Sequence, residues 1–170
     1  MKTIIWFSLL IFSTGIAACG QEINKRIMDP RFGTEVMVGY CDREGLQGDE
    51  EFGLSFNDEY SSYETDDATM KEIRRHRKGI DIVLVLGSWC SDSQEQVPRF
   101  FRILDDAHIK EKSMTIICVD GKKQCSDIDM TPYGIEFVPT IIFYRKGTEI
   151  GRIVETPTNT LESDMLNIIG

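Results

Sequence analysis

The sequence predicts an α/β fold, in which a mixed central sheet is flanked by helices on both faces. One observation is the unbroken, β-branched apolar run from Ile80 to Leu86, which indicates a strand covered on both faces, as in a parallel sheet. A second is the order of patterns along the chain, which reads β, insertion, α, β, α, β, short α or loop, β, β, α. The third is size, because 170 residues with 41% apolar content suffice for one domain with a hydrophobic core.

The first 19 residues are predicted to be a targeting segment. Lys2 supplies a short positive region, and residues 4–12 form an apolar stretch that is too short to be a good membrane span. Residues 16–19 resemble the bacterial lipoprotein signal, in which an aliphatic residue and two small residues precede a cysteine. That resemblance implies lipid attachment to Cys19 and cleavage before it. The alternative is an ordinary secretory signal that contains a cysteine by chance.

Either kind of signal places the mature chain outside the cytoplasm, where disulfides can persist. We expect a lipid-anchored protein of the bacterial cell envelope that faces the periplasm. Gly20 is not the aspartate associated with inner-membrane retention in enterobacteria, which favours the outer membrane. The lipid anchor is then the chain's only expected contact with the membrane.

Composition argues against several classes of partner and cofactor. The net charge of −9 disfavours nucleic acid, which requires a basic surface, and is neutral about small-molecule or protein partners. The chain contains no Cys-x-x-Cys pair and no close His–Cys cluster, so we expect no zinc site and no cofactor. Without Cys19, four cysteines are left, an even number that permits two disulfides but requires none: Cys41, Cys90, Cys118 and Cys125.

The mature chain is divided here into a polar tether or extended lead-in over residues 20–33 and a domain over residues 34–170. Alternating side chains in residues 34–40 predict the first strand. Residues 41–64 are acidic and aromatic and are interpreted as an insertion near the N-terminus of the domain. Its aromatic side chains form either an exposed partner surface or a layer packed on the core. We favour packing, because aromatic side chains bury a large area.

Three helices are expected in the rest of the domain. Residues 65–78 begin with aspartates and end with basic side chains, which suits the helix dipole. Residues 91–107 have an apolar face at helical spacing, and Pro98 is expected to kink this helix. After a strand over 113–119 and a polar connection over 121–134, Asn159 and Glu162 resemble a capping box that opens the last helix.

Cys90 stands out chemically because it lies where the buried strand turns into the central helix. Gly87 and Ser88 end the apolar run, and residues 91–93 are typical of a cap and a first turn. Cys90 is therefore predicted to be the N-cap or the first residue of that helix. Free backbone N–H groups and the positive end of the helix dipole both favour a thiolate there.

Three signals in this order resemble the thioredoxin superfamily over residues 65–170. The first is Trp89 and Cys90 after an apolar strand, with Pro98 eight residues past the cysteine. The second is the sequence Phe-Val-Pro-Thr at 137–140, which looks like the cis-proline loop of that family, and the third is a terminal hairpin. The resemblance implies a thioredoxin-like sandwich in which Pro139 is cis and lies beside Cys90. The backbone of Val138 would then be open to an extended substrate peptide.

The chain departs from the thioredoxin pattern at two chemical positions. Ser93 replaces the second cysteine of the motif, and Leu84 stands where many thioredoxins have a buried aspartate that assists proton transfer. Cys90 could therefore attack a disulfide, but Ser93 could not resolve the mixed disulfide. Three outcomes stay open: resolution by Cys125 or Cys118, resolution by an external thiol, or a catalytically silent site.

These inferences lead to one functional expectation and one alternative. We expect an envelope thiol-dependent redox protein, a thiol-disulfide oxidoreductase or isomerase-like protein, that acts on disulfides or thiols of envelope proteins. The alternative is a non-catalytic thioredoxin-fold module that binds an envelope partner. The expected site comprises Cys90 as nucleophile, Trp89, Ser93, Pro139 and, as a candidate resolving thiol, Cys125.

Overall fold

The central sheet has six strands in the spatial order β1-β2-β4-β3-β5-β6. The structure is a computed structural model and describes residues 22–170. Strand β3 is parallel to β4 and antiparallel to β5, and β2 extends the sheet antiparallel to β4. The mixed α/β sheet that the sequence predicts is therefore confirmed. The strands are β1 (Lys25–Asp29), β2 (Thr34–Cys41), β3 (Ile80–Leu86), β4 (Met114–Cys118), β5 (Thr140–Arg145) and β6 (Thr148–Val154).

The helices lie mostly where the sequence predicts them. The predicted helix over 65–78 is observed as α3, and the predicted central helix over 91–107 as α4, with Pro98 inside it. Two further helices, α1 and α2, occupy the segment expected to be an insertion. The bounds are α1 (Arg43–Gln47), α2 (Glu50–Ser62), α3 (Asp67–His76), α4 (Ser91–Asp106) and α5 (Leu161–Ile169), with the short 3-10 helices η1 (Glu111–Ser113) and η2 (Thr131–Tyr133).

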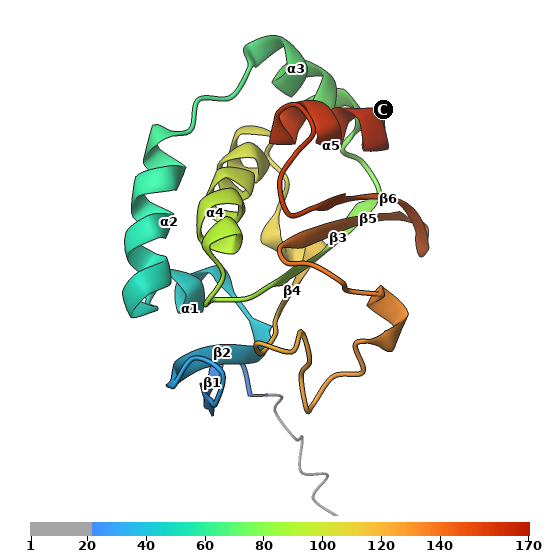
Figure 1. Cartoon of the computed structure of the whole chain (residues 1–170). Coiled ribbons are helices and arrows are strands. Elements are labelled where there is room, and N and C mark those ends of the chain that lie inside the picture. Colours follow the sequence, from blue (N-terminus) through green and yellow to red (C-terminus); the bar gives the residue numbers. More distant parts are fainter. Residues whose placement is uncertain (1–21) are drawn as a thin grey trace, which may run out of the picture.

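The two faces of the sheet are covered differently (Figure 1). Helices α1 to α5 all contribute buried side chains to one cluster, which packs on the face that carries Leu84, Ile116 and Phe143. The opposite face carries Val85 and Ile117, and it is covered by the segment between β4 and β5. The sequence predicts helices on both faces. This segment instead contains only the short helix η2, because its polar sequence lacks an apolar helical stripe.

The acidic segment 41–64 packs on the core, as we favoured from its aromatic content. Phe52 and Phe56 in α2 are fully buried, and the Phe56 ring lies 5.4 Å from that of Phe101 in α4. The Arg43 guanidinium lies over the Phe56 and Phe101 rings, at 5.6 and 5.1 Å from their centroids. This segment is therefore a helical layer of the domain rather than an exposed aromatic surface.

The segment predicted as a tether contains a strand. Residues 25–29 form β1, which pairs with β2 over five residues from Lys25–Val38 to Asp29–Thr34. The polar composition of residues 20–33 suggests a tether. A strand at the edge of a sheet, however, needs only one apolar face, and its other face can be exposed, as Met28 is. The domain therefore begins before residue 34, and its first hairpin turn brings residues 30–33 toward the sheet.

The last helix begins one residue later than the capping box predicts. Thr160 is the N-cap of α5, and its hydroxyl accepts a hydrogen bond from the Ser163 amide at 3.2 Å. The buried Glu162 carboxylate instead accepts hydrogen bonds from the Tyr63 hydroxyl at 2.6 Å and from the Asp66 amide at 3.3 Å. Glu162 therefore connects α5 to the start of α3.

The predicted signal and the lipidation site at Cys19 lie outside the residues that the structure describes. Among residues 22–170, no helix has the length and apolar content that a membrane crossing requires. The lipid anchor therefore stays a prediction.

Candidate functional site

Cys90 lies at the point where β3 has ended and α4 begins. It is the N-cap residue of α4 and has extended backbone angles, with φ −95° and ψ 124°. The side chain is partly exposed, and it makes no capping hydrogen bond to the first turn of the helix. This position agrees with the prediction from the sequence. The free amides of the first turn therefore face the side where the thiol lies.

Pro139 lies next to Cys90 and follows a cis peptide bond, as the thioredoxin resemblance implies. The Cys90 thiol donates a hydrogen bond to the carbonyl oxygen of Val138 at 3.3 Å. The proton on sulfur makes this bond, so Cys90 takes part in it as a thiol donor. The backbone of Val138, which we expected to be open to a substrate peptide, thus already binds Cys90 through its carbonyl.

The turn before Cys90 is fixed by three hydrogen bonds. The Trp89 indole donates to the Val119 carbonyl at 2.9 Å, and the Ser88 hydroxyl accepts from the Met37 amide at 3.0 Å. The Gln94 side-chain amide donates to the Ser88 carbonyl at 3.0 Å. A Cβ on Gly87 would lie 2.6 Å from the indole, so only glycine permits this close contact with Trp89.

Ser93 occupies the position of the second motif cysteine and is fully buried. Its hydroxyl accepts a hydrogen bond from the Gly87 amide at 3.3 Å, which links the first turn of α4 to the end of β3. Ser93 therefore supports the turn that presents Cys90. It offers no thiol to resolve a bond made at Cys90.

The turn between β1 and β2 covers Trp89, which the sequence analysis did not foresee. The Phe32 ring stacks on Trp89 with centroids 4.9 Å apart, and 41% of Phe32 is exposed. The Arg31 guanidinium lies 5.9 Å from the Phe32 centroid and donates a hydrogen bond to the Gly121 carbonyl. Phe137 is 47% exposed, and the Lys123 ammonium lies 5.9 Å from its ring centroid.

Asp29 holds this hairpin turn against the end of β4. Its carboxylate accepts hydrogen bonds from the Gly121 amide and the Arg31 amide, each at 2.7 Å. These two bonds, Gly121 first, hold the pKa of Asp29 below its ordinary value, and Arg31 and Lys122 add attraction. The Asp29 side chain is buried from solvent, so these amides are its main polar partners. Sequence reasoning missed Asp29 because Gly121 is 92 residues away along the chain.

Cys125 lies beside β2, whereas Cys90 contacts Val138, which lies just before β5. Its Sγ is 4.0 Å from the position that a Cβ on Gly39 would take, so Cys125 lies against β2. Two strands, β4 and β3, separate β2 from β5 in the sheet. Among the contacts of residues 22–170, none joins Cys90 to Cys125. The role of Cys125 as the resolving thiol stays a prediction.

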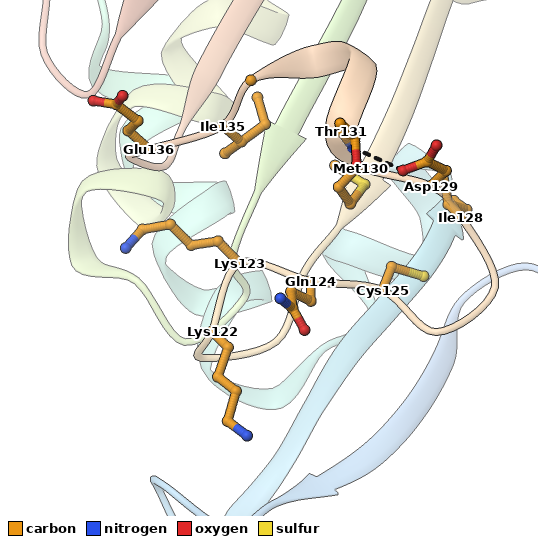
Figure 2. Close-up of a pocket in the computed structure, with 11 residues that line it drawn as sticks. Lys122, Lys123, Gln124, Cys125, Ile128, Asp129, Met130, Thr131, Ile135 and Glu136 are labelled. Carbon is orange, nitrogen blue, oxygen red and sulfur yellow. Dashed lines mark hydrogen bonds between the residues drawn. The ribbon is translucent and has the colours of Figure 1, made fainter.

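A hollow of about 530 Å³ adjoins Cys125 (Figure 2). The segment between β4 and β5 lines it, with Lys122 and Lys123 at one side and Asp129 held by the Thr131 amide at 3.0 Å. Apolar side chains of the same segment reach the cluster that contains Trp89 and Cys90: Ile128, Met130 and Ile135. The segment that lines the hollow therefore also contributes to the apolar cluster beside Cys90.

The family follows from a comparison with known sequence families. The thioredoxin family model named Thioredoxin_9 matches residues 47–165, which is more than half of the chain. The chain belongs to the thioredoxin superfamily. No curated protein matches the sequence. Within the thioredoxin-like domain, residues 22–170 contain no cluster of three or more His, Cys, Asp or Glu side chains that could hold a metal ion.

Two solved structures with TM-scores above 0.5 share this fold at low sequence identity. A protein of unknown function from Pseudomonas aeruginosa has a TM-score of 0.54 and 14% identity, covering 72% of this chain and 75% of its own. An HIV epitope scaffold has a TM-score of 0.51 and 16% identity, covering 73% of this chain and 79% of its own. Thioredoxin O2 from Arabidopsis thaliana, in its oxidised state, has a TM-score of 0.41 and 17% identity, covering 61% and 86%.

Proposed function

We propose that this protein is a thiol-dependent redox protein of the bacterial cell envelope, and that Cys90 forms mixed disulfides with protein substrates. The observation that carries the proposal is the place of the Cys90 thiol. It lies partly exposed at the N-terminus of the 16-residue helix α4, 3.3 Å from the carbonyl next to Pro139. A thiol at a helix N-terminus is favoured as thiolate, which is the nucleophile in disulfide exchange.

The chemical step is a thiol-disulfide exchange. The Cys90 thiolate attacks one sulfur of a substrate disulfide, a new S–S bond forms, and the second substrate sulfur leaves as a thiolate. A second thiol must then attack the mixed disulfide and release Cys90. Ser93 has a hydroxyl and cannot perform this attack, so we infer that the mixed disulfide persists until another thiol arrives.

Two exposed aromatic rings favour a protein substrate over a small one. Phe32 stacks on Trp89, which precedes Cys90, and Phe137 precedes Val138, whose carbonyl binds the Cys90 thiol. Each has a cationic side chain within 6 Å of its ring centroid, Arg31 at 5.9 Å and Lys123 at 5.9 Å. A substrate peptide with apolar side chains and acidic groups near its cysteine fits this surface.

The experiment is to trap partners in vivo and resolve them on non-reducing gels of envelope extracts. Wild type is expected to give high-mass bands that collapse on reduction and are absent in Cys90→Ser. Ser93→Cys is expected to shorten the lifetime of these bands and to raise reductase activity on a generic disulfide substrate. Cys125→Ser removes the other partly exposed thiol, which is not at a helix terminus. It is expected to keep the bands, and a longer band lifetime in this variant would identify Cys125 as the resolving thiol.

Two results would contradict the nucleophile assignment. One is that Cys90→Ser leaves the bands and all measurable activity unchanged. The other is that Cys125→Ser alone removes the bands. The alternative function, a non-catalytic binding module, is favoured if partners co-purify equally with wild type and Cys90→Ser under reducing conditions. The observation that favours this alternative is the buried Ser93, which offers no thiol to resolve a bond made at Cys90.

The anchor is proposed to be a lipid on Cys19, and it has its own test. Cys19→Ala is expected to release the protein from membranes or to block its processing. If this variant fractionates and matures like wild type, Cys19 carries no lipid. This result does not test the chemistry of Cys90, which is measured separately on purified protein.

A further inference from the structure

Two thiols outside the candidate site meet inside the domain. Cys41 ends β2 and Cys118 ends β4, and their Sγ atoms are 2.7 Å apart. Non-bonded carbon atoms, which are smaller than sulfur, prefer a separation of about 3.5–4.0 Å. The two sulfur atoms are therefore closer than an ordinary packing contact permits and are in position for a covalent bond.

The strand register brings both thiols to one face of the sheet. Cys41 lies opposite Ile116, and Cys118 lies opposite Gly39, so the two cysteines are diagonal neighbours on adjacent antiparallel strands. Both belong to the cluster on the helical face of the sheet, where Cys118 is fully buried and Cys41 is 8% exposed.

We propose that Cys41 and Cys118 form an intramolecular disulfide that joins β2 to β4. Each thiol gives up one proton and one electron as the S–S bond forms. The oxidant is an external disulfide of low molecular mass or of a protein, which is reduced to two thiols in the same exchange. The exchange takes place during folding, while both thiols are still accessible to the oxidant.

Burial makes the reduced pair unreactive in the folded protein. Desolvation first, and then the hydrogen bond with Cys41, raise the pKa of the Cys118 thiol well above its ordinary value. The thiolate that disulfide exchange requires is thus disfavoured at Cys118. This pair therefore differs from Cys90, which stays partly exposed at a helix N-terminus.

The disulfide reinforces a short ladder. Strands β2 and β4 pair at only three positions, from Gly39–Cys118 to Cys41–Ile116, whereas β1 and β2 pair at five. The β1–β2 hairpin carries Phe32, which stacks on Trp89 beside Cys90. Because Cys41 and Cys118 are 77 residues apart, their cross-link also restricts the unfolded chain strongly.

Peptide mapping tests the disulfide directly, because trypsin places each cysteine on its own peptide. Cleavage after Lys and Arg gives residues 32–43 with Cys41, 79–99 with Cys90, 113–122 with Cys118 and 124–145 with Cys125. The full chain is isolated from cells without reductant, its free thiols are blocked with N-ethylmaleimide in denaturant, and it is digested. Peptides 32–43 and 113–122 are expected to be joined and to separate on reduction.

The proposal is overturned if peptides 32–43 and 113–122 both carry maleimide, also after refolding in reduced and oxidised glutathione. It is likewise overturned if Cys125 is joined to either partner instead. The Cys90→Ser variant is mapped in parallel and is expected to give the same joined peptides. The outcome is therefore independent of whether Cys90 is a nucleophile.

Thermal unfolding gives a second measurement. Reductant is expected to lower the melting temperature of the wild-type chain by about 10 °C, because a cross-link over a long loop is lost. Cys125→Ser is expected to show the same sensitivity, and the double variant Cys41→Ala/Cys118→Ala is expected to show none. A wild-type melting temperature that reductant does not change would contradict the disulfide.

Discussion

The cysteine side chains on the two faces of the central sheet differ in their exposure to solvent. On the face covered by α1 to α5, Cys41 and Cys118 are buried against each other among aromatic side chains. On the face covered by the segment between β4 and β5, Cys90 is partly exposed beside Trp89. The comparison indicates that the helical face supplies stability, and that the opposite face makes a thiol available.

The difference arises from what covers each face. Five helices can bury large rings such as Phe56 and Phe101, which exclude water from the sheet. The irregular segment 119–139 packs less apolar area on the other face, and its backbone carbonyls bond to the site. Val119 accepts from Trp89, and Val138 accepts from Cys90. Among residues 22–170, the partly exposed thiols therefore lie on the side with the thinner cover.

The largest effect is expected from a substitution on the helical face. Phe101→Ala should lower the free energy of unfolding by about 3–5 kcal/mol, because it leaves a cavity under α2 and α4. Phe32→Ala should lower it by about 1 kcal/mol or less, because that ring is 41% exposed. Urea denaturation measures both changes. The alkylation rate of Cys90 in the folded protein should change in Phe32→Ala and not in Phe101→Ala.

This comparison fails if Phe101→Ala, measured where it is fully folded, changes Cys90 alkylation as much as Phe32→Ala does. It also fails if the two variants are destabilised equally. Leu54→Ala is a suitable control for both assays, because Leu54 lies on α2 but is 74% exposed.

A smaller effect is expected from Asp29, and it depends on pH. The native pKa of Asp29 is below its ordinary value of about 3.9, so its carboxylate stabilises the fold above that pH. The contribution is lost as the pH falls through the ordinary value and then the lower native value. Between pH 5 and pH 3, the melting temperature of wild type should therefore fall more than that of Asp29→Asn.

The matched variant for this test is Asp127→Asn. Asp127 also has a lowered pKa, chiefly through its bond to Lys25, but it is an exposed partner outside the hairpin turn. If Asp29→Asn and wild type lose stability in parallel on acidification, Asp29 does not anchor the turn as the structure indicates.

Local patterns were sufficient to predict much of the site. The apolar run before Gly87 and the polar first turn after it place Cys90 at the start of α4, as observed. The cis bond before Pro139 follows from the thioredoxin resemblance rather than from local physics, and it is present. These features depend on neighbours in sequence or on a motif, so no knowledge of the tertiary contacts was needed.

The features that were missed depend on contacts between distant residues. Asp29 binds the Gly121 amide 92 residues away, and Cys41 meets Cys118 only through the β2–β4 register. An even number of cysteines does not reveal which thiols pair. The helices α1 and α2 did have local signals, because Asp42 and Asp49 cap them, but the acidic composition obscured these.

The most direct measurement of the central claim is the alkylation of the native chain, followed over time at each cysteine. Iodoacetamide is added at neutral pH, samples are quenched and digested, and labelling is read on peptides 79–99, 124–145, 32–43 and 113–122. Cys90 should be labelled several times faster than Cys125, which is also partly exposed, and Cys41 and Cys118 should stay unlabelled. Labelling of Cys125 at the same rate as Cys90, or faster, would contradict the claim that the start of α4 activates Cys90.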